Sequence, residues 1–158
     1  MRGGRGGKPS SLDAFDADVL IYAAVPGHDL GRRVRALFRA EPDQSTGPIV
    51  GIGSVLLLPE VLMKPTRAHA QEELVALGSL LGRLELLSTD HATVELAVAL
   101  GASYGLRAVD AVHLATAVAA GADRFLTNNR SDFPKSITEI DVTYPEDLPD
   151  VGVERMFV

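Results

Sequence analysis

Residues 106–133 limit the folds open to this chain more than any other stretch. They read LRAVDAVHLATAVAAGADRFLTNNRSDF. The first part predicts a helix that is entered at Asp110, ends at Gly121 and is apolar on nearly every face, so it has to be buried. A short strand at 124–127 then leads into a polar turn. Because ligands of α/β proteins bind at strand ends, we expect Asp110 and the turn at 127–132 to meet at one site.

The composition predicts one domain with a real core. The chain has 158 residues, of which 46% are hydrophobic, enough for one domain and too few for two of ordinary size. Its formal charge of −6 argues against a general nucleic-acid coat, so any such contact must be local or metal-assisted. The absence of cysteine excludes disulfides, thiolate metal sites and a cysteine nucleophile.

Hydropathy predicts a cytoplasmic protein without a membrane segment. No apolar run reaches the roughly 18 residues that a membrane span needs, and the Gly/Arg-rich start lacks the apolar core of a signal peptide. We expect a disordered leader at residues 1–11, a single domain at 12–150 and a C-terminal tail at 151–158.

Strands and helices are expected to alternate along this domain. One predicted strand ends near Asp16, and the others span 48–50, 84–88, 124–127 and 137–144. One predicted helix follows Asp16, and others span 28–38, 67–83 and 90–104 or follow Asp110. A further helix is either capped by Ser54 and kinked at Pro59, or begins at Pro59. This alternation predicts an α/β sandwich with a mainly parallel sheet. In the helix at 28–38, four arginines (Arg32, Arg33, Arg35 and Arg39) favour a solvated face over an RNA-binding stripe.

Four acids, Asp16, Glu60, Asp110 and Asp132, lie in four different segments. Spread oxygen ligands without cysteine or a paired-histidine motif suit Mg²⁺ or Mn²⁺ better than zinc. The chemistry natural to such a site is phosphoryl transfer, and the ion reverses the local sign so that phosphate is attracted. Taken singly, an Asp before a helix is more often a cap than a ligand, and Glu60 is explained equally well by its place at a helix N-terminus.

Several motifs together resemble the PIN domain family, typified by VapC-type toxin ribonucleases. Asp-Ala-x-His-Leu-Ala-Thr-Ala begins at Asp110, Gly-Ala-Asp-x-Phe-Leu-Thr-Asn-Asn begins at Gly121, and Asp-Phe follows at Asp132. Asp-Ala-Asp-Val-Leu-Ile-Tyr-Ala, from Asp16, resembles the family's first motif. The likeness spans about residues 15–147 and implies a PIN-like α/β/α sandwich whose mainly parallel central sheet has four to five strands.

The resemblance also implies roles for individual residues. The metal-binding, catalytic acids would be Asp16, Glu60, Asp110 and Asp132. The family's Thr-x-Asp is replaced by Thr127-Asn128-Asn129, so an amide matches the fourth acid; Asn129 can still ligate through its carbonyl oxygen, and Asp132 supplies a charge. Supporting roles fall to Thr127, Asp18 and Asn128. His113 is interpreted as a packed, hydrogen-bonded residue rather than a catalytic one.

The implied activity is that of a Mg²⁺- or Mn²⁺-dependent endoribonuclease, the toxin of a VapBC-type toxin–antitoxin pair. It would hydrolyse RNA of the tRNA or rRNA class and leave a 5′-phosphate and a 3′-hydroxyl. The implied partners are a second copy of the chain and a cognate antitoxin that blocks the metal site.

Two alternatives stay open. Asn129 motivates a catalytically silent PIN-fold binding module. The run from Phe15 to Val19 resembles the nucleophile motif of haloacid-dehalogenase-like phosphatases. Mn²⁺ binding would separate the first alternative from the nuclease, and turnover of an aryl phosphate would identify the second.

Overall fold

The computed structural model describes residues 11–39 and 49–150. The predicted leader, except Ser11, and the predicted tail at 151–158 lie outside the described residues. In chain order the elements are β1 (Asp13–Phe15), α1 (Ala17–Ala24), α2 (Asp29–Arg35), the 3-10 turn η1 (Ala36–Phe38), β2 (Gly51–Ser54), α3 (Leu57–Arg67), α4 (Gln71–Leu81), β3 (Leu84–Leu87), α5 (His91–Tyr104), α6 (Ala108–Ala119), β4 (Arg124–Leu126), β5 (Asp141–Thr143) and the 3-10 turn η2 (Pro145–Asp147).

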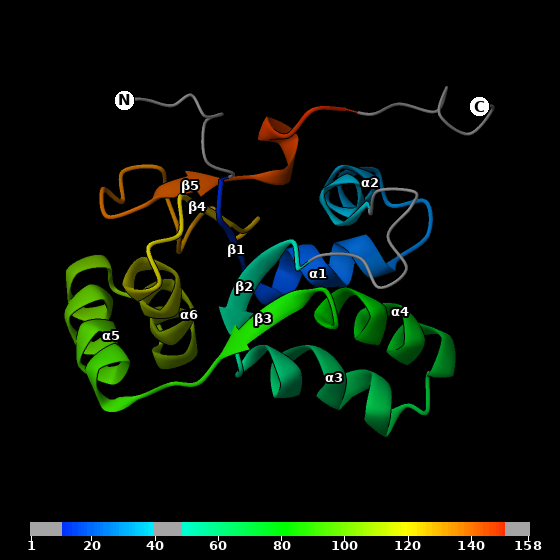
Figure 1. The fold of residues 1–158 in the computed structure, drawn as a ribbon, viewed down its shortest axis with the longest axis horizontal. Coiled ribbons are helices and arrows are strands. Elements are labelled where there is room, and N and C mark those ends of the chain that lie inside the picture. The colour runs from blue at the N-terminus through cyan, green and yellow to red at the C-terminus, as the bar shows by residue number, and fades with distance from the viewer. Residues whose placement is uncertain (1–10, 40–48, 151–158) are drawn as a thin grey trace, which may run out of the picture.

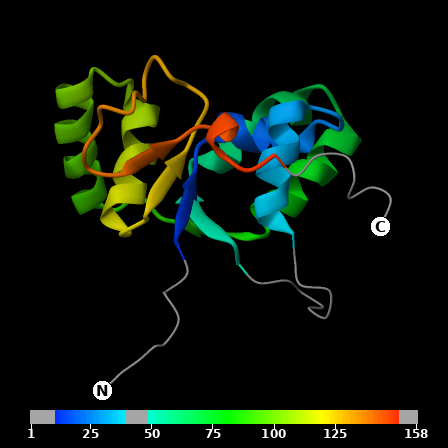
Figure 2. The same cartoon turned by 90° about the horizontal axis from the view of Figure 1, so that it is seen from above.

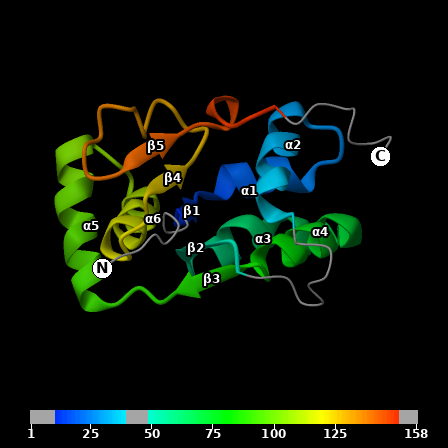
Figure 3. The ribbon, with the colours of Figure 1, turned by 45° about the horizontal axis from the view of Figure 1, so that its top comes forward.

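The strands of the described residues form one five-stranded sheet in the order β3-β2-β1-β4-β5 (Figure 1). Every neighbouring pair is parallel, so each connection has to cross over the sheet. Helices α5 and α6 lie on one face, and α1 to α4 lie on the other (Figures 2 and 3). The predicted α/β/α sandwich with a parallel sheet is therefore confirmed.

The two faces of the sheet bury separate hydrophobic clusters. Ala14 and Phe125 belong to the cluster under α5 and α6, whereas Phe15 and Leu126 belong to the cluster under α1 to α4. Successive strand residues point to opposite faces, and both faces of this sheet are covered. Adjacent apolar residues such as Ala14 and Phe15 in β1, or Phe125 and Leu126 in β4, are therefore both buried.

The second strand lies further along the chain than predicted. Residues 48–50 were expected to pair, but β2 is Gly51–Ser54, and Ser54 ends the strand instead of capping a helix, although its Oγ accepts the N–H of Leu56 at 3.0 Å. Glycine weakens a strand by itself. Here it permits close packing, because a Cβ on Gly51 would lie 2.6 Å from the carbonyl oxygen of Asp13.

Two further boundaries differ from the prediction. The expected helix at 67–83 begins only at Gln71, since α3 runs to Arg67 and His69 turns the chain with φ of 56°. The expected strand at 137–144 is reduced to Asp141–Thr143. Ile137 and Ile140 are buried without being part of a strand. Their apolar pattern therefore reflects the burial of a loop rather than strand pairing.

The arginines of α2 form neither a purely solvated face nor a free basic stripe. Arg33 Nη1 donates to the carbonyl oxygens of Glu146 and Leu148, each at 3.0 Å. Arg35 Nη1 donates to the carbonyl oxygen of Ala23 at 2.9 Å. These bonds satisfy carbonyls at the end of α1 and around η2, so two of the arginines tie α2 to its neighbours.

Among the described residues, no helix is both long and apolar enough to span a bilayer.

Replacing Gly31 with alanine should destabilise the fold. Helices α1 and α2 approach so closely that a Cβ on Gly31 would lie 2.0 Å from the carbonyl oxygen of Tyr22, and backbone cannot yield cheaply. We expect Gly31→Ala to lower the free energy of unfolding by about 3 kcal/mol, measured by urea denaturation. Gly78→Ala is the matched control: its Cβ meets open space, so a gain of about 0.5–1 kcal/mol is expected. Equal stabilities for the two variants would contradict this packing.

Candidate active site

The carboxyl ends of β1 and β4 define the centre of the site. Phe15 pairs with Leu126 in the parallel register, so the next residues, Asp16 and Thr127, lie side by side. From β1 the chain first builds the sheet through β2 and β3, then returns to add β4 and β5 on the other side. The β1–β4 boundary is thus the topological switch point, where open α/β sheets bind ligands.

Asp16 is held rigidly at this point. Its side chain is almost fully buried; Oδ1 accepts the N–H of Ala17 and Oδ2 accepts the hydroxyl of Thr127, both at 2.8 Å. Thr127 Oγ in turn accepts the N–H of Asn129 at 3.0 Å. Burial raises the pKa of Asp16, against the lowering influence of His113 and of these hydrogen bonds. The carboxylate is therefore oriented but poorly neutralised.

Glu60 reaches the site from the first turn of α3 and is held by His113. His113 Nε2 lies 2.5 Å from Glu60 Oε1, and the imidazole is buried whereas the Glu60 side chain is 38% exposed. Burial by itself disfavours the charged imidazole. The hydrogen bond to Glu60 and the carboxylates of Asp16, Glu60 and Asp110 outweigh it and raise the pKa of His113. His113 is thus placed as the packed, hydrogen-bonded residue expected.

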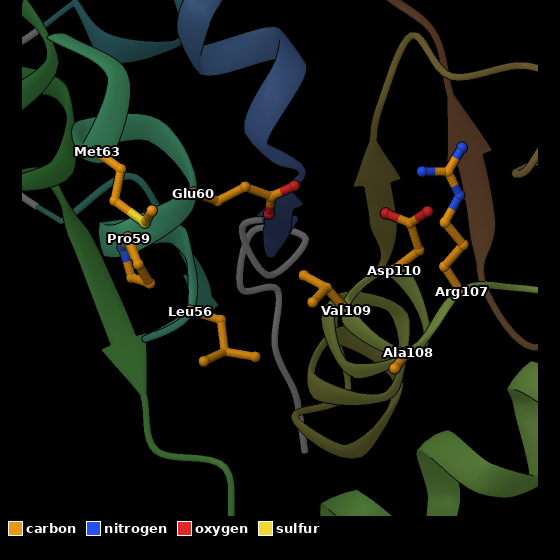
Figure 4. Close-up of a pocket in the computed structure, with 8 residues that line it drawn as sticks. All are labelled: Leu56, Pro59, Glu60, Met63, Arg107, Ala108, Val109 and Asp110. Atoms are coloured by element: carbon orange, nitrogen blue, oxygen red, sulfur yellow. The ribbon is translucent and has the colours of Figure 1, made fainter. Parts of the chain in front are cut away.

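Asp110 faces Glu60 across the gap between α3 and α6 (Figure 4). It is the third residue of α6, since the helix begins at Ala108 rather than at Asp110 as predicted. Burial first, and then the charges of Asp16, Asp132 and Glu60, raise the pKa of Asp110 to about 6. Alongside burial, the negative charges of all three other predicted acids therefore raise the pKa of Asp110.

The turn after β4 fixes Asp132 through Asn129. Asn129 Nδ2 donates to Asp132 Oδ2 at 2.9 Å, and Asn129 Oδ1 accepts the N–H of Asp132 at 3.3 Å and the hydroxyl of Ser131 at 3.2 Å. The amide expected to replace the fourth acid is therefore engaged within the turn, where it orients the Asp132 carboxylate. Its role as a metal ligand stays a prediction.

Asp18 forms a second polar group beside Asp16. Asp18 Oδ2 accepts the N–H of Asn128 at 3.0 Å, and Asn128 Nδ2 donates to the hydroxyl of Tyr22 at 3.3 Å. Burial and the Asp16 charge raise the pKa of Asp18 to about 7. Sequence reasoning missed Tyr22, although its place four residues after Asp18 on α1 puts both on one helix face.

A divalent cation suits the chemistry of these donors. Within the described residues, Asp16, Asp18, Asp110 and Asp132 form no ion pair, and buried Asp18 Oδ1 and Asn128 Oδ1 have no hydrogen-bond partner. In the same part of the chain, no three His, Cys, Asp or Glu residues are arranged to hold an ion. Mg²⁺, which binds through one or two carboxylates and keeps several waters, fits such an open set.

Comparison with protein families matches residues 14–135 to the family described as the PIN domain. The chain belongs to this family. A search of curated proteins gives no match.

Among solved structures, the PIN fold of this chain resembles a chain of a toxin–antitoxin complex from Klebsiella pneumoniae. The TM-score is 0.65 at 24% identity, over 86% of this chain and 98% of the other. It also resembles a chain of VapBC2 from Rickettsia felis bound to a promoter DNA fragment, with a TM-score of 0.61 at 17% identity, over 84% and 98%. The recognition of the PIN family and of its fold is confirmed.

The electrostatics of this PIN domain predict that the metal-free protein loses stability as pH rises from 5 to 7.5. The raised pKa values of Asp18 and Asp110 mean that the folded chain binds more protons than the unfolded chain over this range, and His113 acts in the same direction. We expect the melting temperature in EDTA to fall by about 3–5 °C.

A matched pair of variants tests the cause. Asp18→Asn should remove part of the fall, whereas Asp141→Asn, an exposed carboxylate of β5, should leave it unchanged. Saturating Mn²⁺ should raise the melting temperature more at pH 7.5 than at pH 5. A melting temperature that rises with pH in EDTA would refute this account of the site.

Proposed function

We propose that this PIN domain is a Mg²⁺- or Mn²⁺-dependent endoribonuclease and the toxin of a toxin–antitoxin pair. One observation carries the proposal. Carboxylates from the end of β1, from α3, from α6 and from the turn after β4 converge at the switch point, and in the described part of the chain the only cationic partner among them is His113 at Glu60. Carboxylates without a bound cation repel RNA, which supports a reaction at phosphate that depends on a metal ion.

The proposed ligands are Asp16, Asp110, Glu60 and Asp132. When bound, the divalent ion would neutralise charge on the scissile phosphodiester and activate water for its hydrolysis. Asp16 is aimed by Thr127 and by the N–H of Ala17. His113 holds one oxygen of Glu60, which leaves the other oxygen for the ion, and Asn129 orients Asp132.

The proposed partner is a cognate antitoxin. The two similar solved structures are a toxin–antitoxin complex and VapBC2 bound to promoter DNA, and they support an antitoxin partner. That the antitoxin blocks the acidic site is part of the proposal. A homodimer belongs to the same proposal, as do tRNA or rRNA substrates.

Loss of the central acids should abolish cleavage. We expect Asp16→Asn and Asp110→Asn to reduce Mg²⁺-dependent cutting of mixed tRNA and rRNA by more than about 100-fold, because each removes a proposed ligand and its charge. The measurement is a gel-based cleavage assay with Mg²⁺, Mn²⁺ or EDTA. Asp141→Asn, which removes an exposed carboxylate away from the site, serves as control. Full activity in the Asp16 and Asp110 variants would refute the proposal.

The second candidate is a silent PIN-fold binding module, favoured by the engagement of Asn129 within its own turn. Calorimetric titration with millimolar Mn²⁺ separates the two candidates, because a silent module gives no binding heat. Among the described residues, no observation favours the phosphatase alternative.

Asn129→Asp should lower the stability of the metal-free protein and raise its affinity for Mn²⁺. The change places a second carboxylate within hydrogen-bond distance of Asp132, where Asn129 Nδ2 now lies 2.9 Å from Asp132 Oδ2. The melting temperature in EDTA should fall. Mn²⁺ affinity should rise about fivefold, because one added charge near the ion contributes about 1 kcal/mol. Calorimetry at pH 7.5 provides the measurement, and an unchanged affinity would place residue 129 outside the ion's field.

A further inference from the structure

The proposed catalytic acids stand at the edge of a pocket that the proposed chemistry leaves unexplained. The pocket has a volume of about 460 Å³ and lies between α3 and the start of α6; it is lined by Leu56, Pro59, Glu60, Met63, Arg107, Ala108, Val109 and Asp110 (Figure 4). This volume is in the range of small-ligand sites. Its apolar walls neither bind metal nor contact phosphate favourably, so the proposed chemistry gives them no role.

The apolar walls are unusually exposed. Met63 is 58% and Val109 is 44% exposed, and both rank among the large hydrophobic residues that the described chain leaves at its surface. They come from opposite sides of the pocket, Met63 from α3 and Val109 from α6 (Figure 4). A flat apolar group would be sandwiched between them, which would remove both side chains from water.

The charges of the pocket change once a cation is bound. Glu60 and Asp110 would then be committed to the ion, and Arg107 remains as the positive group of the lining. Within the described residues the guanidinium of Arg107 forms no hydrogen bond or ion pair, although its backbone carbonyl accepts the N–H of Ala111. Apolar walls beside one free guanidinium match a nucleobase with its own phosphate. They match a basic peptide poorly, because Arg107 repels it.

We propose that this pocket holds the base of the nucleotide next to the scissile phosphate and thereby sets sequence preference. This inference builds on the proposed ribonuclease function and adds a subsite for one unpaired base. An RNA strand with its phosphate at Asp16 and Asp110 must pass this pocket, because Asp110 belongs to both. Single-stranded or looped RNA is then the substrate, since a paired base cannot enter.

The first experiment measures cleavage of short single-stranded RNAs that carry each base, or an abasic residue, beside the cut site. We expect Val109→Ala and Met63→Ala to raise KM for the preferred base about fivefold, with kcat unchanged, and to flatten the preference among bases. Arg107→Gln should raise KM for all bases alike and reduce its salt dependence. The matched control is Val75→Ala, a valine of α4 that is 67% exposed and outside the pocket.

A second experiment reports binding without cleavage. An RNA carrying 2-aminopurine at the same position is titrated with Asp16→Asn protein in Mg²⁺, and its fluorescence should change on binding. Val109→Ala added to this protein should weaken the change about fivefold, and Val75→Ala should not. Base-dependent binding without cleavage by the wild-type protein would support the subsite and overturn the nuclease.

Cleavage that is indifferent to an abasic residue and to Val109→Ala would overturn the subsite and leave the nuclease standing. Tight binding of a fluorescent hexa-arginine peptide that Val109→Ala weakens, together with base-independent RNA binding, would also overturn the subsite. The pocket would then belong to a protein partner.

Discussion

The parallel pairing of β1 with β4 is the constraint on which the rest of this molecule depends. It joins residues 111 positions apart and sets Asp16 against Thr127, whose hydroxyl holds the buried carboxylate at 2.8 Å. A shift of β1 by one residue would turn Phe15 away from its cluster and move Asp16 out of register with Thr127. The same register that buries the core therefore aims the central acid.

Around that acid the fold concentrates charge that it does not neutralise. Glu60 and Asp110 lie in the first turns of α3 and α6, where helix dipoles favour negative charge, and the His113 imidazole is hydrogen-bonded to Glu60. The raised pKa values of Asp18 and Asp110 show that the folded chain resists full ionisation of this cluster. Holding these carboxylates together lowers the stability of the folded chain, and under the proposed function a bound cation would offset their repulsion.

Local sequence signals identified most elements correctly because their causes are local. Gly105 and Gly121 end helices with positive φ, and Asp90 caps α5 by accepting the N–H of Thr93. The predictions failed where pairing or packing at a distance decided the outcome. β2 contains two glycines and forms because β1 and β3 flank it, and Ile137 and Ile140 imitate a strand because a loop is buried there.

The sequence by itself determined the fold class, the PIN family and the identity of the acids that converge, since motif residues and apolar periodicity are properties of short segments. Only the tertiary structure decided which groups meet. It paired His113 with Glu60, turned the Asn129 amide towards Asp132, and opened an apolar pocket between Met63 and Val109. The His113–Glu60 contact and the pocket join α3 to α6, which are far apart in the chain, so their geometry depends on where the sheet places these two helices. The Asn129–Asp132 contact lies within one turn, but side-chain orientation there is not encoded by residue type alone.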